Sequence, residues 1–516
     1  MQAGGIRRVL RALACAGLAW LALAGAAMAA VEVDPFIRRE EFSALKLSPG
    51  GDYLAATLPL EDRTGLVILR LSDLKPTARF SLGRNTDIAW FEWASDSRVL
   101  LGVADKLGML AEPQPTGEVM VVDAEGGRPE MLVGWRVDGS AGARVGHKKA
   151  EAVWAFLADM LPSDPNNVVL NVGTFSEDTY TRAERLDIRS GRRTVVARVP
   201  VRRAEFVTDH AGVVRVAVGA NADNASQLYY RASADAEWQL INGEASSGRR
   251  EVPLGFSADG RILYLQSTMP KGPDAIVAYD VESGQRSTVL RHDTVDPVAV
   301  IHASTGAREP IGVQFMDGVP RFEFFAKDHP DVRLYRMLGE AFEGEAAYPV
   351  SRTADGRLAL VRVDSDRNAG DFFLFDTTTL KARHLVSRRE WLDPLKMAER
   401  RPVALDARDG LRLHGYLTLP RGGERNLPLV LLPHGGPYGI RDDWYFDDDA
   451  QLLAAAGYAV LQVNYRGSGG YGEDFKQAGA RQWAARLAPM LDAINRRPDI
   501  HEARQYGSRT GPTDRP

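Results

Sequence analysis

The chain has 516 residues, and its 64 Lys and Arg residues nearly balance its 68 Asp and Glu residues, for a formal net charge of −4. This length corresponds to about two to four average domains. A composition of 45% hydrophobic and 26% charged residues is typical of a globular protein, not of a disordered or fibrous one. The balanced charge excludes a global basic footprint for nucleic acid, and the single cysteine excludes a disulfide framework.

The first 29 residues have the features of a secretory signal peptide. Three arginines lie within the first eleven residues, residues 12–27 are almost wholly apolar, and Ala27–Ala29 supplies small residues for cleavage. The mature chain, from about Ala30, then has no cysteine, which suits an oxidising compartment. We therefore expect a periplasmic or secreted protein with no membrane attachment after cleavage. An uncleaved anchor is the alternative.

A strand–turn–strand unit recurs along residues 30–387. Clear copies of its turn lie near residues 52, 96, 259 and 355, and weaker copies lie near 166, 211 and 306. The spacings in chain order are 44, 70, 45, 48, 47 and 49 residues. A second turn, with Gly four residues after Asp, begins at Asp123, Asp187 and Asp280. Two turns in a unit of nearly constant length predict an all-β seven-bladed propeller with one insertion. An array of β-sandwiches is the alternative.

After residue 387 the pattern changes to that of an α/β protein. The expected elements are a short helix or linker at 395–399, a hairpin of 402–405 with 411–419, a buried parallel strand at 429–433, a helix at 450–456 and a buried strand at 458–463. Asp447, Asp448 and Asp449 carry negative charge at the start of the helix, which complements its dipole. Residues 388–483 are thus predicted to form the N-terminal part of an α/β domain.

Two glycine-rich loops follow the two buried strands. His434-Gly435-Gly436-Pro437 comes directly after the first strand, where paired glycines let backbone N–H groups point into an open crevice, as a developing oxyanion requires. Residues 464–472 follow the second strand and lack the Gly-Lys-Ser/Thr ending of a phosphate-binding loop.

These loops, with 457–460, Phe475 and 479–483, resemble the prolyl oligopeptidase family of serine peptidases, especially its bacterial dipeptidyl-peptidase and acylaminoacyl-peptidase-like branch. The resemblance covers about residues 402–483. It implies an α/β-hydrolase domain capped by a propeller that restricts access to short peptides. Catalysis would use a Ser nucleophile, a His base and an Asp, with Gly435 and Gly436 at the oxyanion turn.

Other polar residues of these loops are not expected to perform catalysis. The resemblance places His434 and Ser468 in loops distinct from those that hold the family's base and nucleophile. We interpret the His434 side chain as one that shapes its loop. Tyr465 and Arg466 are expected to be structural, because their loop is anchored between strands.

The family's G-x-S-x-G nucleophile motif does not occur between residues 30 and 516. The most similar segment, around Ser508, lacks the residue between Gly and Ser that the motif requires, and no apolar strand precedes it. Residues 484–516 contain six Arg, four Pro and only four Leu or Ile, so we expect an aberrant, disordered tail. Because 54 of the 64 basic residues are Arg, which suggests GC-rich coding DNA, we hypothesise truncation or a frameshift near codon 484. The partial sheet should then have an unpaired edge and an uncovered apolar face.

The sequence therefore predicts a serine peptidase of this family acting on short peptides, in a chain that lacks the catalytic triad and is inactive by itself. The alternatives are a non-catalytic propeller that binds peptides or a protein partner, and an esterase of the same fold. No cofactor or metal is expected, since the propeller histidines have no paired-ligand spacing: His147, His210, His292, His302, His329 and His384. The oligomeric state is left open.

Overall fold

The computed structural model describes residues 31–108, 112–136, 151–305, 308–423, 425–436 and 438–481, and the backbone of 146–147. The predicted signal peptide, the predicted tail at 484–516 and Ser508 lie outside these residues. Within these ranges, no helix has both the length and the apolar character needed to span a membrane.

Residues 45–387 form sheets whose strands are adjacent in sequence and antiparallel, except that β9 pairs parallel with β8. The first three sheets are β1 Leu45–Leu47, β2 Tyr53–Pro59, β3 Thr64–Arg70, β4 Pro76–Phe80; β5 Thr86–Trp93, β6 Arg98–Asp105, β7 Gln114–Asp123, β8 Glu130–Val133, β9 Gly146–His147; and β10 Val153–Asp159, β11 Asn167–Thr174, β12 Arg182–Asp187, β13 Arg193–Arg198.

The pattern continues to residue 387. The remaining sheets are β14 Arg202–Thr208, β15 Val214–Ala220, β16 Ser226–Tyr230, β17 Gln239–Gly243; β18 Glu251–Phe256, β19 Ile262–Ser267, β20 Ala275–Asp280, β21 Arg286–Arg291; β22 Pro297–His302, β23 Pro310–Asp317, β24 Val319–Phe324; and β25 Ala346–Arg352, β26 Leu358–Asp364, β27 Asp371–Asp376, β28 Lys381–Ser387. The short helix α3 (Glu244–Ser247) follows β17.

The predicted turns near residues 52, 96, 166, 211, 259 and 355 lie between the first and second strands of their sheets. The turn predicted at residue 306 lies outside the described residues. Gly260 has φ +70°, and the Asp259 carboxylate accepts a hydrogen bond from the Arg261 N–H at 3.1 Å. The second set of turns joins third and fourth strands, as where Asp187 accepts from the Ser190 N–H at 2.7 Å. Short polar side chains that bond their own backbone therefore set the turns of the repeat.

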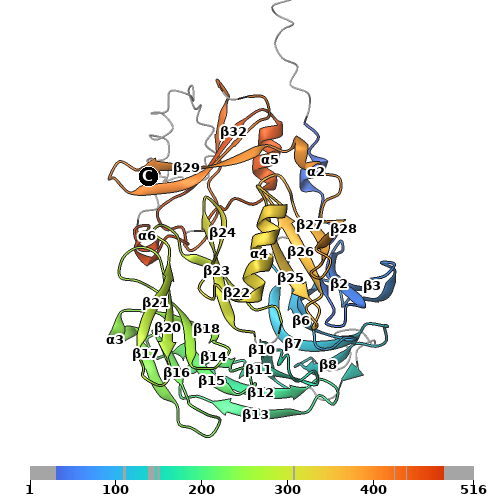
Figure 1. The fold of residues 1–516 in the computed structure, drawn as a ribbon, viewed down its shortest axis with the longest axis vertical. Coiled ribbons are helices and arrows are strands. Elements are labelled where there is room, and N and C mark those ends of the chain that lie inside the picture. The colour runs from blue at the N-terminus through green and yellow to red at the C-terminus, as the bar shows by residue number, and fades with distance from the viewer. Residues whose placement is uncertain are drawn as a thin grey trace, which may run out of the picture.

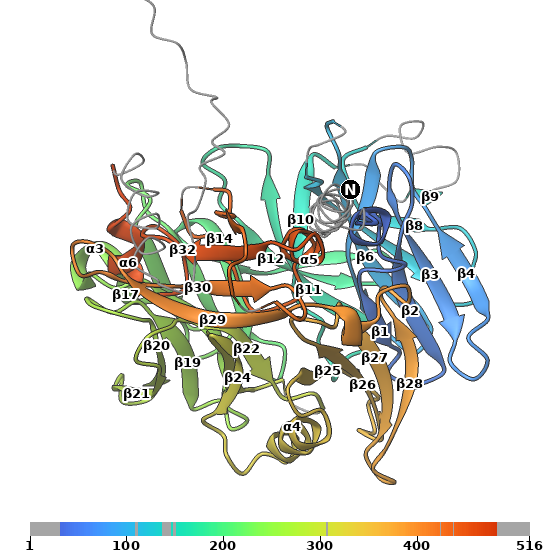
Figure 2. The same cartoon turned by 90° about the horizontal axis from the view of Figure 1, so that it is seen from above.

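The sheets follow one another around a ring and form a β-propeller (Figure 2). The ring closes where the first sheet meets the sheet of β25–β28. The Leu47 N–H donates to the Ser351 hydroxyl at 2.8 Å, and the Ala354 N–H donates to the Pro49 carbonyl at 2.8 Å. Leu360 joins the buried residues of the first sheet in one hydrophobic cluster. Hydrogen bonds and hydrophobic packing between the first sheet and the sheet of β25–β28 thus hold the propeller closed.

The sheet of β22–β24 has three strands, and helix α4 (Pro330–Ala341) follows it in sequence. The His329 imidazole caps α4 by accepting from the Asp331 N–H at 3.2 Å. Leu334 and Leu338 of α4 pack against buried residues of β25–β27. The repeat alone did not predict this helix.

The last sheet lies on one side of the propeller (Figure 1). It contains β29 Glu399–Asp406, β30 Arg412–Leu419, β31 Leu429–Leu431 and β32 Ala459–Asn464, in the order β29-β30-β32-β31, and only β31 and β32 are parallel neighbours. The other elements are α2 Asp34–Ile37, the 3₁₀ turn η1 Pro394–Lys396, α5 Asp448–Ala455 and α6 Glu473–Gln477. The predicted hairpin and the helix are present.

The burial predicted for the two α/β strands is correct for one of them. All six residues of β32 are buried, as expected. The prediction of a fully buried strand at 429–433 is wrong, because β31 spans only Leu429–Leu431 and each residue is half-buried. Within the described residues β31 pairs only with β32, so it forms the edge of the sheet.

The last sheet and the propeller share one hydrophobic core. Leu461, Val463 and Phe475 cluster with Ile276 and Phe315 of the propeller, all of them buried. The expectation that this apolar face is uncovered is therefore wrong, since propeller side chains pack against it. A separate hydrogen bond, from the Trp391 indole to the Pro35 carbonyl at 2.8 Å, joins the segment of α2 to the connection between β28 and β29.

Candidate active-site loops

The candidate site lies where β31 and β32 end. Because the two strands are parallel, the loops after them leave the same edge of the sheet. The backbones continue together for one more residue, where the Leu432 N–H donates to the Leu461 carbonyl at 2.9 Å. The Gly439 N–H then donates to the Gly467 carbonyl at 3.2 Å. Parallel pairing thus brings the two glycine-rich loops of the sequence together.

His434, Ser468 and Tyr465 form the contact between these loops. The Nε2 atom of His434 lies 2.9 Å from the Oγ atom of Ser468. The Tyr465 ring stacks on the imidazole, with centroids 4.5 Å apart and planes 12° apart. The Tyr465 hydroxyl lies 3.0 Å from the carbonyl oxygen of His434 and 3.1 Å from that of Gly436, and can donate to either.

The His434–Ser468 distance is that of a nucleophile–base pair, but the geometry does not suit a nucleophile. Ser468 is only 1% exposed, so its hydroxyl cannot reach a substrate carbonyl. Its own N–H donates to the Tyr465 carbonyl at 2.9 Å, which keeps it inside a tight turn. Ser468 and Tyr465 therefore position the loop of His434.

Gly435 and Gly436 are exposed at the tip of this loop. Gly436 has φ +77°, and a Cβ there would lie 2.4 Å from the Cδ1 atom of Ile440. The positive φ therefore favours glycine at this turn. Among the described residues, no acceptor pairs with the backbone N–H of Gly435 or of Gly436. Exposed, unpaired amides on a fixed turn are suited to stabilise an oxyanion.

A buried polar network supports both loops from below. The Asp442 N–H donates to the Asn464 side-chain oxygen at 2.7 Å, and the Asn464 amide donates to the Asp442 carbonyl at 2.9 Å and to the Tyr471 hydroxyl at 2.8 Å. Burial raises the pKa of the Asp442 carboxyl, against the opposing effect of His434. The sequence alone does not pair Asp442 with Asn464, although the polar Asn464 at the end of a fully buried strand is a signal of a buried hydrogen-bond network.

Arg466 anchors the second loop to the β29–β30 turn. Its Nη2 atom lies 2.9 and 2.7 Å from the two carboxylate oxygens of Asp409. Asp409 lies in the turn predicted from Asp409-Gly410, so a hairpin turn and a loop 57 residues further on are joined by one ion pair.

The end of the second loop also binds the propeller. The Gly472 N–H donates to the Asp296 carboxylate at 3.0 Å, and the Asp296 N–H donates to the Gly470 carbonyl at 2.9 Å. A Cβ at Gly472 would lie 2.3 Å from the Gly272 carbonyl oxygen. The propeller thus determines where this loop lies.

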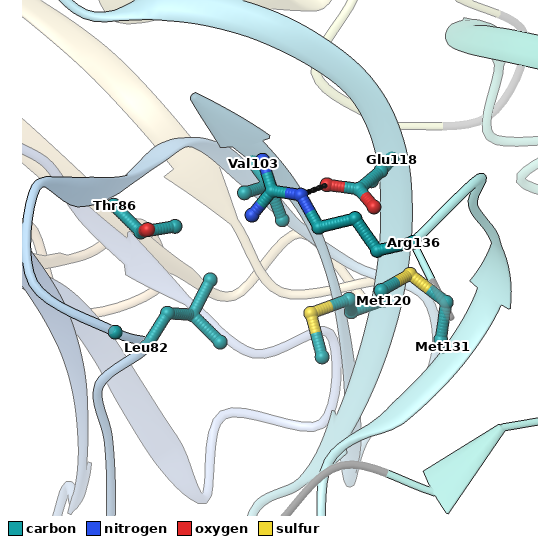
Figure 3. Close-up of a pocket in the computed structure, with 8 residues that line it drawn as sticks. Leu82, Thr86, Val103, Glu118, Met120, Met131 and Arg136 are labelled. Carbon is teal, nitrogen blue, oxygen red and sulfur yellow. Dashed lines mark ion pairs between the residues drawn. The ribbon is translucent and has the colours of Figure 1, made fainter. Parts of the chain in front are cut away.

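A small, mostly apolar pocket that holds one buried ion pair lies inside the second propeller sheet (Figure 3). Its buried Glu118 accepts from the Thr116 hydroxyl at 3.1 Å and lies 3.1 Å from the Nε atom of Arg136, which also pairs with Asp105. Burial raises the pKa of the Glu118 carboxyl, partly offset by Arg136. Thr86 and Met120 line the same pocket. This pair belongs to the interior of the propeller and does not contact the candidate loops.

The other residues considered in the sequence have structural contacts. Asp447 caps α5, where its carboxylate accepts from the Ala450 N–H at 2.8 Å. His210 and His302 bond to the backbone carbonyls of Ser257 and Leu254. In the described part of the chain, no group of three or more His, Cys, Asp or Glu residues is arranged to hold a metal. His147 lies outside the residues whose side chains are described.

The chain is similar in sequence to known peptidases, and one of these matches includes the second loop of the candidate site. The profile of the prolyl oligopeptidase family matches residues 444–489, which include α5, β32 and the second loop. The match extends to residue 489 and so passes residue 483, the predicted end of the resemblance. The dipeptidyl aminopeptidase BIII of Pseudoxanthomonas mexicana is 28% identical over 352 residues, 66% of this chain and 50% of that protein. An uncharacterized peptidase, YuxL, of Bacillus subtilis is 39% identical over 103 residues, 19% of this chain and 16% of its own.

Solved structures show the same fold. A prolyl endopeptidase has a TM-score of 0.59 at 12% identity and covers 90% of this chain and 68% of its own. A puromycin-hydrolyzing peptidase of Mycobacterium tuberculosis has a TM-score of 0.57 at 15% identity, covering 86% and 70%.

The fold and the loops together define a β-propeller protein with a hydrolase-type α/β sheet. The family match of residues 444–489, the relatives and the solved structures support a place for this chain in the prolyl oligopeptidase family of peptidases. The chain spans half the length of the Pseudoxanthomonas relative that it matches.

Proposed function

We propose that this chain provides the propeller and the oxyanion turn of a serine peptidase that acts on short peptides. The observation that carries the proposal is the pair of exposed glycines, Gly435 and Gly436, whose N–H groups have no acceptor among the described residues. In acyl transfer the scissile carbonyl oxygen becomes an anion, and two such N–H groups would stabilise it. His434, Ser468 and Tyr465 would hold the turn ready for this role.

We further propose that the 516-residue chain by itself does not hydrolyse peptides. Residues 30–516 contain no G-x-S-x-G motif, and Ser468, the serine next to an imidazole, is buried. The chain would then bind a peptide without forming an acyl-enzyme. An esterase reaction would need the same nucleophile and is expected to be absent for the same reason.

Short peptides are the proposed substrates. The dipeptidyl aminopeptidase name of the Pseudoxanthomonas relative supports this class. The order of seven sheets along residues 45–387 supports a seven-bladed propeller, whose narrow ring would exclude folded proteins.

Secretion or export to the periplasm is also proposed, on the basis of the N-terminal residues. Expression of the full gene in a bacterial host, followed by N-terminal sequencing of the exported protein, tests it. The expected first residue is near Ala30. A cytoplasmic product that retains Met1 would contradict the proposal.

Peptide binding without turnover is the test of the proposed function. Fluorescein-labelled tripeptides are titrated into the full chain, anisotropy is recorded, and the same mixtures are examined for cleavage by liquid chromatography. Saturable binding with uncleaved peptide is expected. Absence of saturable binding would contradict a peptide-binding propeller, and cleavage would contradict the proposed inactivity.

A further inference from the structure

A cleft separates the propeller from the β29–β30 hairpin, away from the candidate oxyanion turn. Its volume is about 310 Å³, at the lower end of the range of small-molecule sites. Val295 and residues 316–318 line it from the propeller, and residues 402–404, Arg412 and residues 414–416 line it from the hairpin. Tyr471 completes the lining.

His414 and Tyr471 form a flat aromatic wall of this cleft. Their rings are stacked, with centroids 4.9 Å apart and planes 13° apart. Burial lowers the pKa of the His414 imidazole, and Arg412 lowers it further, so the ring is neutral at neutral pH. Within the described residues neither ring nitrogen has a hydrogen-bond partner, which leaves one donor and one acceptor for a ligand.

Charged groups of both signs face His414. Arg412 lies at the mouth and bonds Asp406 through Nη1 at 2.8 Å, so its other donors can turn to a ligand. Arg441 lies over the Tyr471 ring at 5.0 Å and donates to the Met316 carbonyl at 2.8 Å. Arg412 and Arg441 stand against two carboxylates, Asp317 and Asp406, but Arg412 bonds Asp406 through Nη1 alone. The other donors of Arg412, beside an aromatic wall, suit a ligand that is both anionic and aromatic.

We propose that this cleft binds a small molecule that carries a carboxylate next to an aromatic group, such as the C-terminal residue of a short peptide. Arg412 contacts the carboxylate, and the His414–Tyr471 wall contacts the aromatic ring. The site is separate from the turn of Gly435 and Gly436, and its existence does not depend on the proposed peptidase reaction.

The probe is N-acetyl-L-phenylalanine, titrated into the full chain carrying isotope-labelled histidine, with the affinity measured by calorimetry. The His414 ring signal, assigned with His414→Gln, is expected to shift on binding. N-acetyl-L-phenylalanine amide, which lacks the carboxylate, is expected to bind at least about fivefold more weakly.

The Arg412→Ala variant distinguishes a specific contact between Arg412 and the carboxylate from nonspecific binding of the probe. It should weaken binding of the acid about fivefold and leave the amide unchanged. Arg261→Ala is the matched control, because Arg261 is also 56% exposed and paired with an aspartate, Asp280. It should not change either affinity. An unshifted His414 signal, equal affinities for acid and amide, or an acid affinity insensitive to Arg412→Ala would each overturn the proposal.

Discussion

The Nε2 atom of His434 lies 2.9 Å from the hydroxyl oxygen of Ser468, so a side-chain hydrogen bond joins the loops that follow β31 and β32. Tyr465 stacks on the same imidazole. The conformation of the Gly435-Gly436 turn therefore depends on residues more than 25 positions further along the chain. This link makes the loop positions testable by substitutions outside the turn itself.

Removal of the Ser468 hydroxyl should loosen the His434 loop. For Ser468→Ala we expect the free energy of unfolding to fall by about 1 kcal/mol, and the ring nitrogen signals of His434 to shift in NMR spectra. Ser468→Thr keeps a hydroxyl and should keep the wild-type signals. Ser283→Ala, in an exposed turn, is the control for stability. Unchanged His434 signals in Ser468→Ala would contradict the assigned contact.

Two glycines with the same backbone angle test the contact between the second loop and the propeller. Gly472 and Gly457 both have φ +90°, but only at Gly472 would a Cβ meet the propeller backbone, 2.3 Å from the Gly272 oxygen. Gly457→Ala should cost about 1 kcal/mol of stability through backbone strain alone. Gly472→Ala should cost at least about 2 kcal/mol more, because the loop must move. Equal losses in urea unfolding would show that this contact is absent.

Phe475 tests the shared core. Its ring is 8% exposed and clusters with Ile276 and Phe315 of the propeller. Phe475→Ala should lower the free energy of unfolding by about 3 to 5 kcal/mol and increase hydrogen exchange in β23. Phe175→Ala, at a 59% exposed position, should have little effect. If β23 kept its full protection in Phe475→Ala, the two parts would not share a core.

Asp274 predicts a dependence of stability on pH. Burial raises the pKa of its carboxyl, and the charges of Asp296 and Glu473 raise it further. A carboxyl with a raised folded-state pKa binds its proton more tightly in the folded state, so its charged form destabilises the fold at pH values above that pKa. Asp274→Asn should therefore increase the free energy of unfolding at neutral pH. The gain should disappear as the pH falls below the ordinary Asp value of 3.8.

Asp259 is the contrasting case for the same measurement. Hydrogen bonds from the Ser257 hydroxyl and the Arg261 N–H lower its pKa. Its charged form stabilises the fold above the ordinary pKa, and this stabilisation is lost as the pH falls through the lowered value. Asp259→Asn should thus reduce stability at neutral pH. Changes of the same sign in the two variants would contradict these assignments.

Local chemistry explains which parts of the fold the sequence predicts. The Asp259-Gly260 type of turn forms through bonds within a few residues, so its repeat reveals the hairpins directly. The apolar run of β32 likewise reports a strand covered on both faces. The same composition at β31 does not give the same burial, because the position of a strand in its sheet depends on its neighbours and not on its own residues.

The sequence does not predict which residues of the site contact each other across long distances in the chain. The glycine pattern locates the Gly435-Gly436 turn, but the partner of His434 lies 34 residues away and depends on parallel pairing of β31 with β32. The wall of His414 and Tyr471 requires the packing of two strands and a loop against the propeller. Such pairs follow from tertiary packing, and no local motif marks them.

Covalent labelling of the folded 516-residue chain with a fluorophosphonate probe, read by intact-mass spectrometry, tests the proposed function most directly. A reactive serine beside a working base would add one probe molecule. We expect the mass to remain that of the unmodified chain, because Ser468 is buried and residues 30–516 contain no G-x-S-x-G motif. A stoichiometric adduct, located by peptide mapping on Ser468 or any other serine, would contradict the proposal.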